Sequence, residues 1–154
     1  MRHKSPIYLV DMSYFVKNYM VKEIPTIEDT VSVTEAAKAM NKIGRGFLII
    51  LKNLRPVGIA TEHDFVNKVI ANDKDPIKTT VGSIMSSPLV TVDPDEDLLK
   101  ASELMQKSNI ERLPVVRDGI IYGILSASDI AKGCSIYVDK ATREIARWSL
   151  PLGV

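Results

Sequence analysis

The chain contains an internal repeat, and this repeat constrains the fold more than any other feature of the sequence. When the sequence is shifted by 65 residues, residues 16–66 lie over residues 81–131 without a gap. Both copies also show the same order of apolar and polar segments, and this agreement between levels favours two copies of one structural unit. The identical pairs are Val16 and Val81, Met20 and Met85, Thr26 and Thr91, Ala36 and Ala101, Met40 and Met105, Lys42 and Lys107, Leu48 and Leu113, Gly58 and Gly123, Ile59 and Ile124, and Asp64 and Asp129.

Each copy begins with a short apolar strand and an amphipathic helix. We predict the strands at residues 24–27 and 89–92. The helices follow from apolar residues at the i, i+3, i+4 and i+7 spacing of one buried face. Acidic residues 95–97 stand where the N-terminus of the second helix favours negative charge. The predicted faces consist of Val33, Ala36, Ala37 and Met40 in the first copy and of Leu98, Ala101, Ser102 and Met105 in the second.

Two apolar runs follow each helix and predict a β-hairpin. The runs are residues 47–51 and 57–60 in the first copy, and 113–116 and 120–125 in the second. Asp118-Gly119 suits a two-residue type I′ turn, which needs positive φ at both residues. Its counterpart is Asn53-Leu54, and because leucine is a poor residue for positive φ, we expect a different or wider turn there. A final helix is predicted at about 61–71 and again at about 126–134.

These elements predict an α/β (α+β) fold of two β-α-β-β-α repeats that pack around a pseudo-twofold axis. We divide the chain into an N-terminal extension (1–15), repeat 1 (16–72), a polar linker (73–80), repeat 2 (81–134) and a C-terminal segment (135–154). Units of this size bury too little surface to be stable alone, so the repeats should pack on each other. Apolar residues between Tyr137 and Leu150 recur at helical spacing and predict a helix that docks on the core or on a second subunit.

Composition narrows the functional classes. Lys and Arg number 20 against 19 Asp and Glu, which gives no extended basic field for nucleic acid or an anionic membrane. The single cysteine, Cys134, cannot form an internal disulfide, and no apolar run approaches the length of a membrane span. We therefore expect a cytoplasmic protein without nucleic-acid or membrane partners.

Several of these motifs resemble a known family. The segment Arg112-Leu113-Pro114-Val115-Val116, followed by Asp118-Gly119 and by residues 123–130, is similar to the second half of a CBS domain, and residues 44–50 and 58–65 are similar to the same half of another. Residues 84–92 resemble the opening of such a domain. The resemblance covers residues 16–134 and implies a CBS pair, or Bateman module. Such modules commonly bind AMP, ADP, ATP or S-adenosylmethionine in clefts between the repeats, and they often form dimers.

The candidate binding residues lie where each hairpin gives way to a helix. Thr61 and Ser126 place a hydroxyl beside the free backbone N–H groups of a helix N-terminus, which attract phosphate. Asp64 and Asp129, three residues on, could accept two hydrogen bonds from a ribose diol, as the aspartate at this position does in the resembled family. The alternative is a capping box, in which the same side chains satisfy backbone donors and bind nothing.

Further candidates surround this motif. His63 could donate to a phosphate, or it could simply face solvent; because Ser128 replaces it in the second copy, we expect the first motif to grip phosphate better. Arg112 could supply positive charge or form a surface ion pair. An apolar slot for a purine ring, or alternatively ordinary core, is predicted from Ile24, Pro25, Leu89 and Val90.

We find no arrangement typical of an enzyme: the sequence has no Ser/His/Asp set or phosphate-binding glycine loop, and only two histidines. The chain is therefore expected to be a sensor that requires no cofactor, binds an adenosyl ligand, forms a homodimer and regulates an unidentified protein by contact. Ligand binding would shift the packing of the repeats, with the terminal helices as the readout. A ligand-free dimerisation or protein-interaction module remains the alternative.

Overall fold

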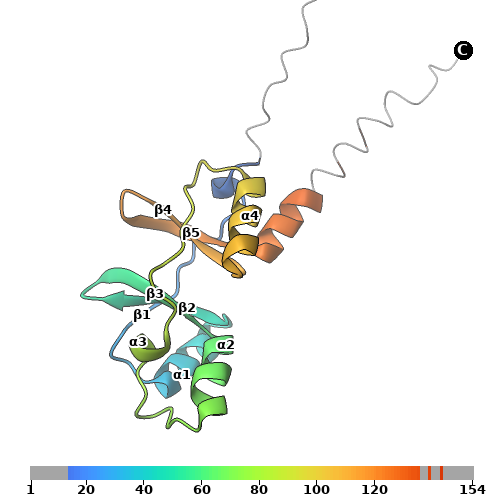
Figure 1. Cartoon of the computed structure of the whole chain (residues 1–154). Helices are drawn as coiled ribbons and strands as arrows, with labels where there is room; N and C mark the ends of the chain where they lie inside the picture. Colours follow the sequence, from blue (N-terminus) through green and yellow to red (C-terminus); the bar gives the residue numbers. More distant parts are fainter. Residues whose placement is uncertain (1–13, 136–138, 140–142, 144–154) are drawn as a thin grey trace, which may run out of the picture. The chain divides into compact units, whose positions relative to one another are not determined.

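A computed structural model describes residues 14–135 together with residues 139 and 143. Residues 23–90 form one compact unit, and segments on both sides of it, within 1–22 and 91–154, form a second. Each unit combines helices with a small sheet, which confirms the predicted mixed α+β class (Figure 1). Residues 1–13 of the predicted extension lie outside the described residues, as does the predicted helix 137–150 except for residues 139 and 143.

A three-stranded sheet in the order β1-β2-β3 organises the unit of residues 23–90. β1 (Thr26–Glu28) pairs in parallel with β2 (Phe47–Lys52), and β2 pairs antiparallel with β3 (Arg55–Thr61). The first strand begins two residues later than predicted. The segment before it forms no continuous backbone pairing with β2, and only the carbonyl of Pro25 accepts a hydrogen bond, from the N–H of Ile49. The predicted hairpin is confirmed.

The helix α1 (Val33–Ile43) connects β1 to β2 and shows how the sequence sets its limits. It begins after Ser32, whose hydroxyl accepts a hydrogen bond from a backbone N–H of the first turn. It ends at Gly44, where φ is 65° and a residue without Cβ carries no steric penalty. Three of the four predicted core residues of α1 are buried, but Ala37 is exposed, because the buried stripe is narrower than predicted and Ala37 falls at its edge.

A continuous helical segment follows β3, as predicted, although it is not uniformly α-helical. α2 (Glu62–Asp64) passes into a π-helical turn (Phe65–Val69) and then a 3-10 turn (Ile70–Asn72). The short helix α3 (Val81–Ile84) closes the unit. Full burial of each large apolar side chain contributes about 1.5–3 kcal/mol. The buried core comprises Val33, Ala36, Met40, Leu48, Ile50, Ala60, Phe65, Val69, Val81 and Ile84.

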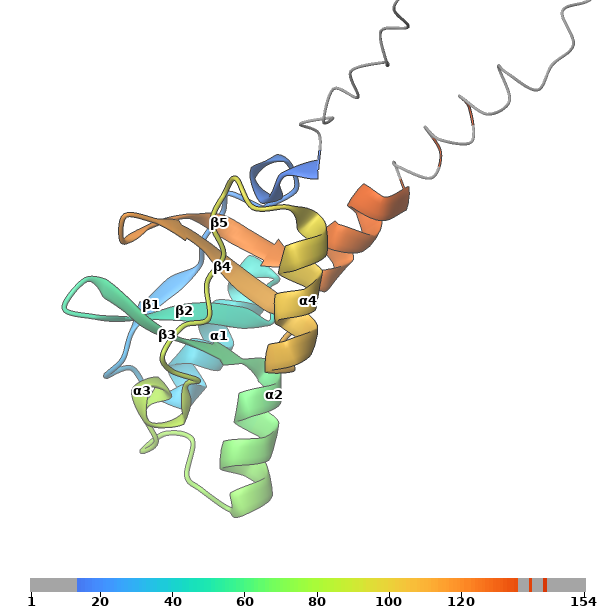
Figure 2. The same cartoon turned by 45° about the horizontal axis from the view of Figure 1, so that its top comes forward.

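The second unit contains α4 (Leu98–Ser108) and the antiparallel hairpin of β4 (Arg112–Arg117) and β5 (Ile120–Ser126). Residues 127–135 are helical, and two views place this helix beside α4 (Figures 1 and 2). A Cβ added at Gly133 would lie 2.8 Å from Leu98 Cδ1, which fits that close approach. In α4 the predicted residues Leu98, Ala101 and Met105 are buried, and Ser102 is half-buried.

The predicted strand 89–92 is wrong. Only Val92 pairs, through a single parallel bridge to Val115 in β4. Pro94 has no N–H to extend a ladder, and the carboxylate of Asp93 accepts the N–H of Asp95, which turns the chain. The predicted strand also straddles residues 90 and 91, where the chain passes from one unit to the other.

The two units are completed by a reciprocal exchange of segments. Val21, in repeat 1, forms two backbone hydrogen bonds of 2.9 Å with Ile124 in β5. Ser86, which stands 65 residues after Val21, forms the equivalent pair with Ile59 in β3, at 2.8 and 3.0 Å. Each repeat therefore gives its opening segment to the unit that contains the hairpin of the other.

Both hairpin turns have positive φ at their two residues. Asp118 and Gly119 have φ values of 52° and 75°, which confirms the predicted type I′ character. The prediction for the other turn is wrong, because Asn53 and Leu54 also have positive φ, at 52° and 63°. Only two residues separate β2 from β3, so hairpin closure imposes on leucine a conformation that it disfavours.

Candidate functional site

The first candidate motif lies at the junction of β3 and α2. Thr61, the last residue of β3, accepts a hydrogen bond from the N–H of Asp64 through its hydroxyl. The carboxylate oxygen Oδ2 of Asp64 in turn accepts the N–H of Thr61 at 2.9 Å and its hydroxyl at 3.1 Å. The pair forms a capping box, and Asp64 is only 7% exposed. The capping geometry of the alternative interpretation is thus present, and it uses only one of the two carboxylate oxygens of Asp64.

The second motif repeats this geometry after β5. Oδ2 of Asp129 accepts the N–H of Ser126 at 2.8 Å and its hydroxyl at 2.6 Å. The hydroxyl of Ser126 accepts the N–H of Asp129 at 3.2 Å. Asp129 is buried like its counterpart, so both motifs hold an aspartate against the strand end in one orientation.

The second carboxylate oxygen distinguishes the motifs. Oδ1 of Asp64 forms an ion pair of 2.8 Å with Lys68, one helical turn on, whereas the residue equivalent to Lys68 in the second repeat is Gly133. Within the described part of the chain, Oδ1 of Asp129 takes part in no hydrogen bond or ion pair. Lys68 was not identified from the sequence, although its i, i+4 spacing from Asp64 is the signal that could have found it.

The other polar candidates differ between the repeats as well. His63 is exposed, and its Nε2 lies 2.6 Å from the side-chain amide nitrogen of Asn67. Ser128, its counterpart, has its hydroxyl 2.8 Å from the hydroxyl of Ser126. Arg112 is the first residue of β4 and is half-buried.

The apolar candidates Ile24, Pro25, Leu89 and Val90 are all half-buried. All four belong to the unit of residues 23–90, together with Thr61, His63 and Asp64. The remaining candidates, Arg112, Ser126 and Asp129, belong to the other unit. The structure therefore brings each hydroxyl and its aspartate together and places the two pairs in different units.

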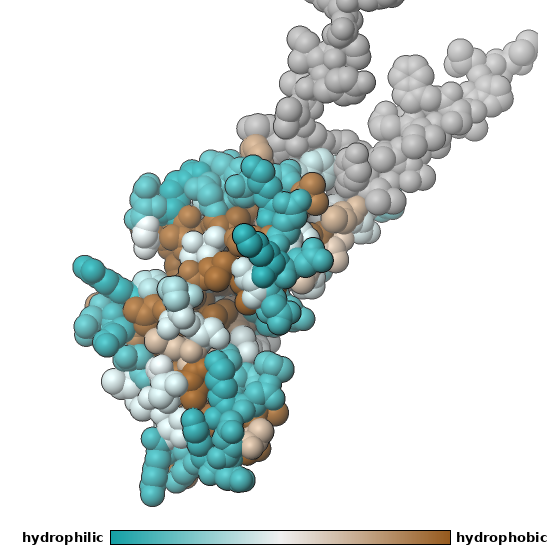
Figure 3. All heavy atoms as spheres, viewed as in Figure 1, coloured by the Kyte–Doolittle hydropathy of each residue, from teal (hydrophilic) through white to brown (hydrophobic). Residues whose placement is uncertain are grey.

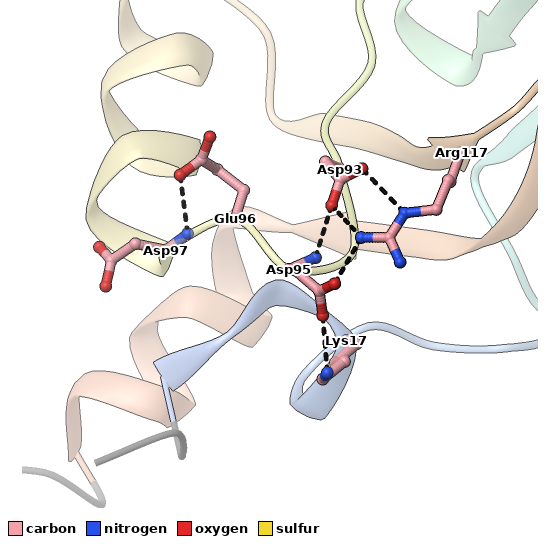
Figure 4. A network of polar contacts seen from close by, with 6 residues as sticks. All are labelled: Lys17, Asp93, Asp95, Glu96, Asp97 and Arg117. Carbon is pink, nitrogen blue, oxygen red and sulfur yellow. Dashed lines mark hydrogen bonds and ion pairs between the residues drawn. The ribbon is translucent and has the colours of Figure 1, made fainter. Parts of the chain in front are cut away.

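A network of charged residues in the second unit was not predicted from the sequence. Arg117, at the end of β4, donates to Asp93 through Nε at 3.1 Å and through its terminal nitrogen at 2.6 Å, and it also donates to Asp95 (Figure 4). Lys17 reaches Asp95 at 2.6 Å. The hydrogen bond from Arg117 lowers the pKa of Asp93. The pKa of Asp95 is lowered mainly by its hydrogen bond from Lys17 and next by its hydrogen bond from Arg117. The network fastens residues 14–22 to the unit that they complete.

Among the described residues, no helix has the length and apolar character needed to cross a membrane. In the same part of the chain no three His, Cys, Asp or Glu side chains gather as a metal site would require. Hydrophilic residues cover much of the visible surface, interrupted by patches of hydrophobic ones (Figure 3). The exposed large apolar residues include Leu54 at the turn of the first hairpin and Val66 and Ile70 on the helical segment after α2.

The two repeats share a strand-to-helix motif and exchange their opening segments. This arrangement defines a module of two tandem domains. The model of the CBS domain family matches residues 16–71 and again residues 81–135. The chain therefore belongs to the CBS domain family, as the sequence motifs indicated, and it carries two copies. Tandem CBS domains are generally regulatory modules.

Individual relatives agree with this assignment. An uncharacterised protein of Methanopyrus kandleri is 36% identical over 111 residues, which is 71% of this chain and 57% of that protein. A mitochondrial CBS domain-containing protein of Arabidopsis thaliana is 33% identical over 112 residues, 70% of this chain and 53% of that protein. This chain thus spans little more than half the length of these two relatives.

Solved structures share the fold. The hexameric CBS-CP12 protein from bloom-forming cyanobacteria has a TM-score of 0.72 and 33% sequence identity, and the match covers 76% of this chain and 66% of that one.

Proposed function

We propose that the chain is a regulatory sensor that binds an adenosyl ligand (AMP, ADP, ATP or S-adenosylmethionine) at its two Ser/Thr-x-x-Asp motifs. The observation that carries this proposal is the second motif. Asp129 is buried, its Oδ2 is held by Ser126, and its Oδ1 has no partner in the described part of the chain. A carboxylate fixed by one oxygen presents the other to a ligand hydroxyl.

The chemistry suits a nucleoside. A ribose diol offers two O–H donors, which an ionised carboxylate accepts in charge-assisted hydrogen bonds. The first motif has the same capping geometry. His63, which is exposed, would donate a hydrogen bond to a phosphate there. Arg112 would add positive charge in the other unit. Ile24, Pro25, Leu89 and Val90, all in the unit of Thr61 and Asp64, would hold the adenine ring.

The role that follows is regulation without catalysis. We propose that the protein works in the cytoplasm as a dimer or larger self-assembly and acts by contact with another protein. The hexameric state of the cyanobacterial relative supports self-association. A ligand-free interaction module would share the fold and the self-association but would show no response to adenosyl compounds.

A thermal-shift screen against AMP, ADP, ATP, S-adenosylmethionine and GMP tests the proposal. A ligand at 100 times its Kd stabilises a protein by about 2.7 kcal/mol, which raises Tm measurably. We expect at least one adenosyl compound to raise Tm and GMP to have less effect. The rise should be lost or reduced in Asp129→Ala and Asp64→Ala, each measured against its own ligand-free Tm because both changes also break a cap.

Ser32→Ala provides the matched control, since it removes the N-cap of α1 without touching either motif. This variant should have a lower baseline Tm, by the ~1 kcal/mol that a cap contributes, and an unchanged ligand response. If no adenosyl compound shifts the wild-type protein, the sensor is refuted and the interaction module takes its place.

A further inference from the structure

Lys68 belongs to the first motif and has no counterpart in the second, where Gly133 stands at the equivalent position. The Nζ of Lys68 lies 2.8 Å from Oδ1 of Asp64 and donates a hydrogen bond of 2.8 Å to the carbonyl of Ile84, the last residue of α3. The Asp64 side chain is 10% exposed and that of Lys68 is 42% exposed. The ammonium group therefore covers the outer oxygen of an otherwise buried carboxylate.

Both oxygens of Asp64 are consequently in use. Oδ2 accepts the N–H and hydroxyl of Thr61, and Oδ1 accepts from Lys68. A ligand hydroxyl that approaches Asp64 must compete for Oδ1 with an ammonium group, whose positive charge attracts the carboxylate in addition to the hydrogen bond, whereas the hydroxyl is neutral. Asp129 presents no such competition, because Gly133 stands at the equivalent position.

A lysine cannot simply be added to the second motif. A Cβ at Gly133 would lie 2.8 Å from Leu98 Cδ1 and 3.0 Å from Tyr19 Cε1. A side chain at this position would therefore require Leu98 or Tyr19 to shift, and the close packing of helix 127–135 disfavours it. The difference between the motifs is built into the two repeats.

We propose that Lys68 is a lock on the first motif: it holds Asp64 closed against a ligand diol, so that the second motif binds first and more tightly. This proposal rests on the proposed function. Because the same ammonium group binds Ile84, release of the lock would also free the end of α3. The segment after α3 carries Ser86, which pairs with β3, so occupation of the first motif would loosen the exchanged segment 85–90.

Adenosine is the probe that isolates the lock, because it offers the diol and carries no phosphate that Lys68 could attract. Isothermal titration compares Asp129→Ala, in which only the first motif is intact, with the double variant Asp129→Ala/Lys68→Met. Methionine keeps an unbranched stem and removes the charge. We expect the double variant to bind adenosine about tenfold more tightly, the equivalent of ~1.4 kcal/mol. Asp64→Ala, which keeps only the second motif, should bind more tightly than Asp129→Ala.

Lys38→Met is the matched control, since it removes a lysine of the same kind by breaking the exposed pair with Glu35, of 2.7 Å, on α1. Combined with Asp129→Ala it should leave adenosine affinity unchanged. Asp129→Asn replaces Asp129→Ala if the alanine variant fails to fold, because an amide oxygen can still accept the N–H of Ser126. Circular dichroism confirms that each variant is folded.

The outcomes separate the two proposals. Unchanged or weaker adenosine binding on loss of Lys68, with binding at the second motif intact, refutes the lock alone. A loss of AMP affinity without any gain for adenosine overturns it in favour of a phosphate contact. No adenosine binding by the wild type or any variant refutes the lock, and the proposed function is refuted with it if AMP, ADP, ATP and S-adenosylmethionine also fail to shift the Tm of the wild type.

Discussion

The exchanged segments pass close to two glycines, and substitution of these glycines tests whether the exchange stabilises each unit. A Cβ at Gly58 would lie 2.5 Å from Met85 Sδ and 2.9 Å from the carbonyl oxygen of Ser86. A Cβ at Gly123 would lie 2.7 Å from the carbonyl oxygen of Val21 and 2.9 Å from Met20 Sδ. Separations under 3.0 Å require a shift, so alanine at either position should force the exchanged segment away from its hairpin.

The magnitude follows from what must move. Overpacking costs about 1–3 kcal/mol, and each kcal/mol lowers Tm by about 2–4 °C for a chain of this size. At Gly58 the nearest atom is the sulfur of the flexible Met85 side chain. At Gly123 it is the backbone oxygen of Val21, which accepts the N–H of Ile124 at 2.9 Å and cannot move without its strand partner. Gly123→Ala should therefore lie near the upper end of the range and Gly58→Ala near the lower.

Thermal unfolding followed by circular dichroism measures the Tm of both variants. Adding Met85→Ala to Gly58→Ala should recover the part of the Tm loss that is due to the clash with the sulfur. Hydrogen exchange should show faster exchange at Val21 and Ile124 in Gly123→Ala. Wild-type stability in both variants, or a larger loss at Gly58 than at Gly123, would show that close contact with the exchanged segments does not limit these positions.

Two further predictions concern the surface. Leu54→Gly should raise Tm by about 2–4 °C, because leucine in the left-handed region costs roughly 1–2 kcal/mol and the greater unfolded-state entropy of glycine offsets only part of this. The Leu54 side chain is 82% exposed, so little packing is lost, and a lower Tm would contradict the prediction. Arg117→Gln should lower the urea midpoint at pH 7 but have progressively less effect below about pH 3.8. The folded pKa values of Asp93 and Asp95 are below their ordinary 3.8, so their contribution to stability is present above that pH and is lost as the pH falls through the folded pKa. A difference in urea midpoint between variant and wild type that stays constant from pH 7 to pH 3 would exclude this contribution.

Much of the fold follows from the sequence because its signals are local. The helix faces at Val33, Ala36 and Met40, and again at Leu98, Ala101 and Met105, depend only on helical spacing, and both sets are buried. The turn at Asp118-Gly119 depends on residues that tolerate positive φ. The turn at Asn53-Leu54 was missed because hairpin closure, a tertiary constraint, overrides the preference of leucine.

The exchanged segments could not be predicted for a different reason. Because residues 16–23 and 81–88 have similar patterns and the two hairpins are also alike, either segment is compatible with either hairpin edge. No local property distinguishes the two pairings. For the candidate site, the sequence located both hydroxyl–carboxylate pairs but not the ion pair of Lys68, since spacing alone does not show whether a lysine on a helix turns toward its neighbour or toward solvent.

The exchange also sets an order in which the units are completed on the ribosome. Residues 23–90 are contiguous in the sequence, so this unit has all its parts as soon as α3 and residues 85–90 have been synthesised. The other unit must wait, because Val21 meets Ile124 only after about a hundred further residues have been added. Until then residues 14–22 lack their partner strand, and the unit formed between them and the second repeat is the last to close.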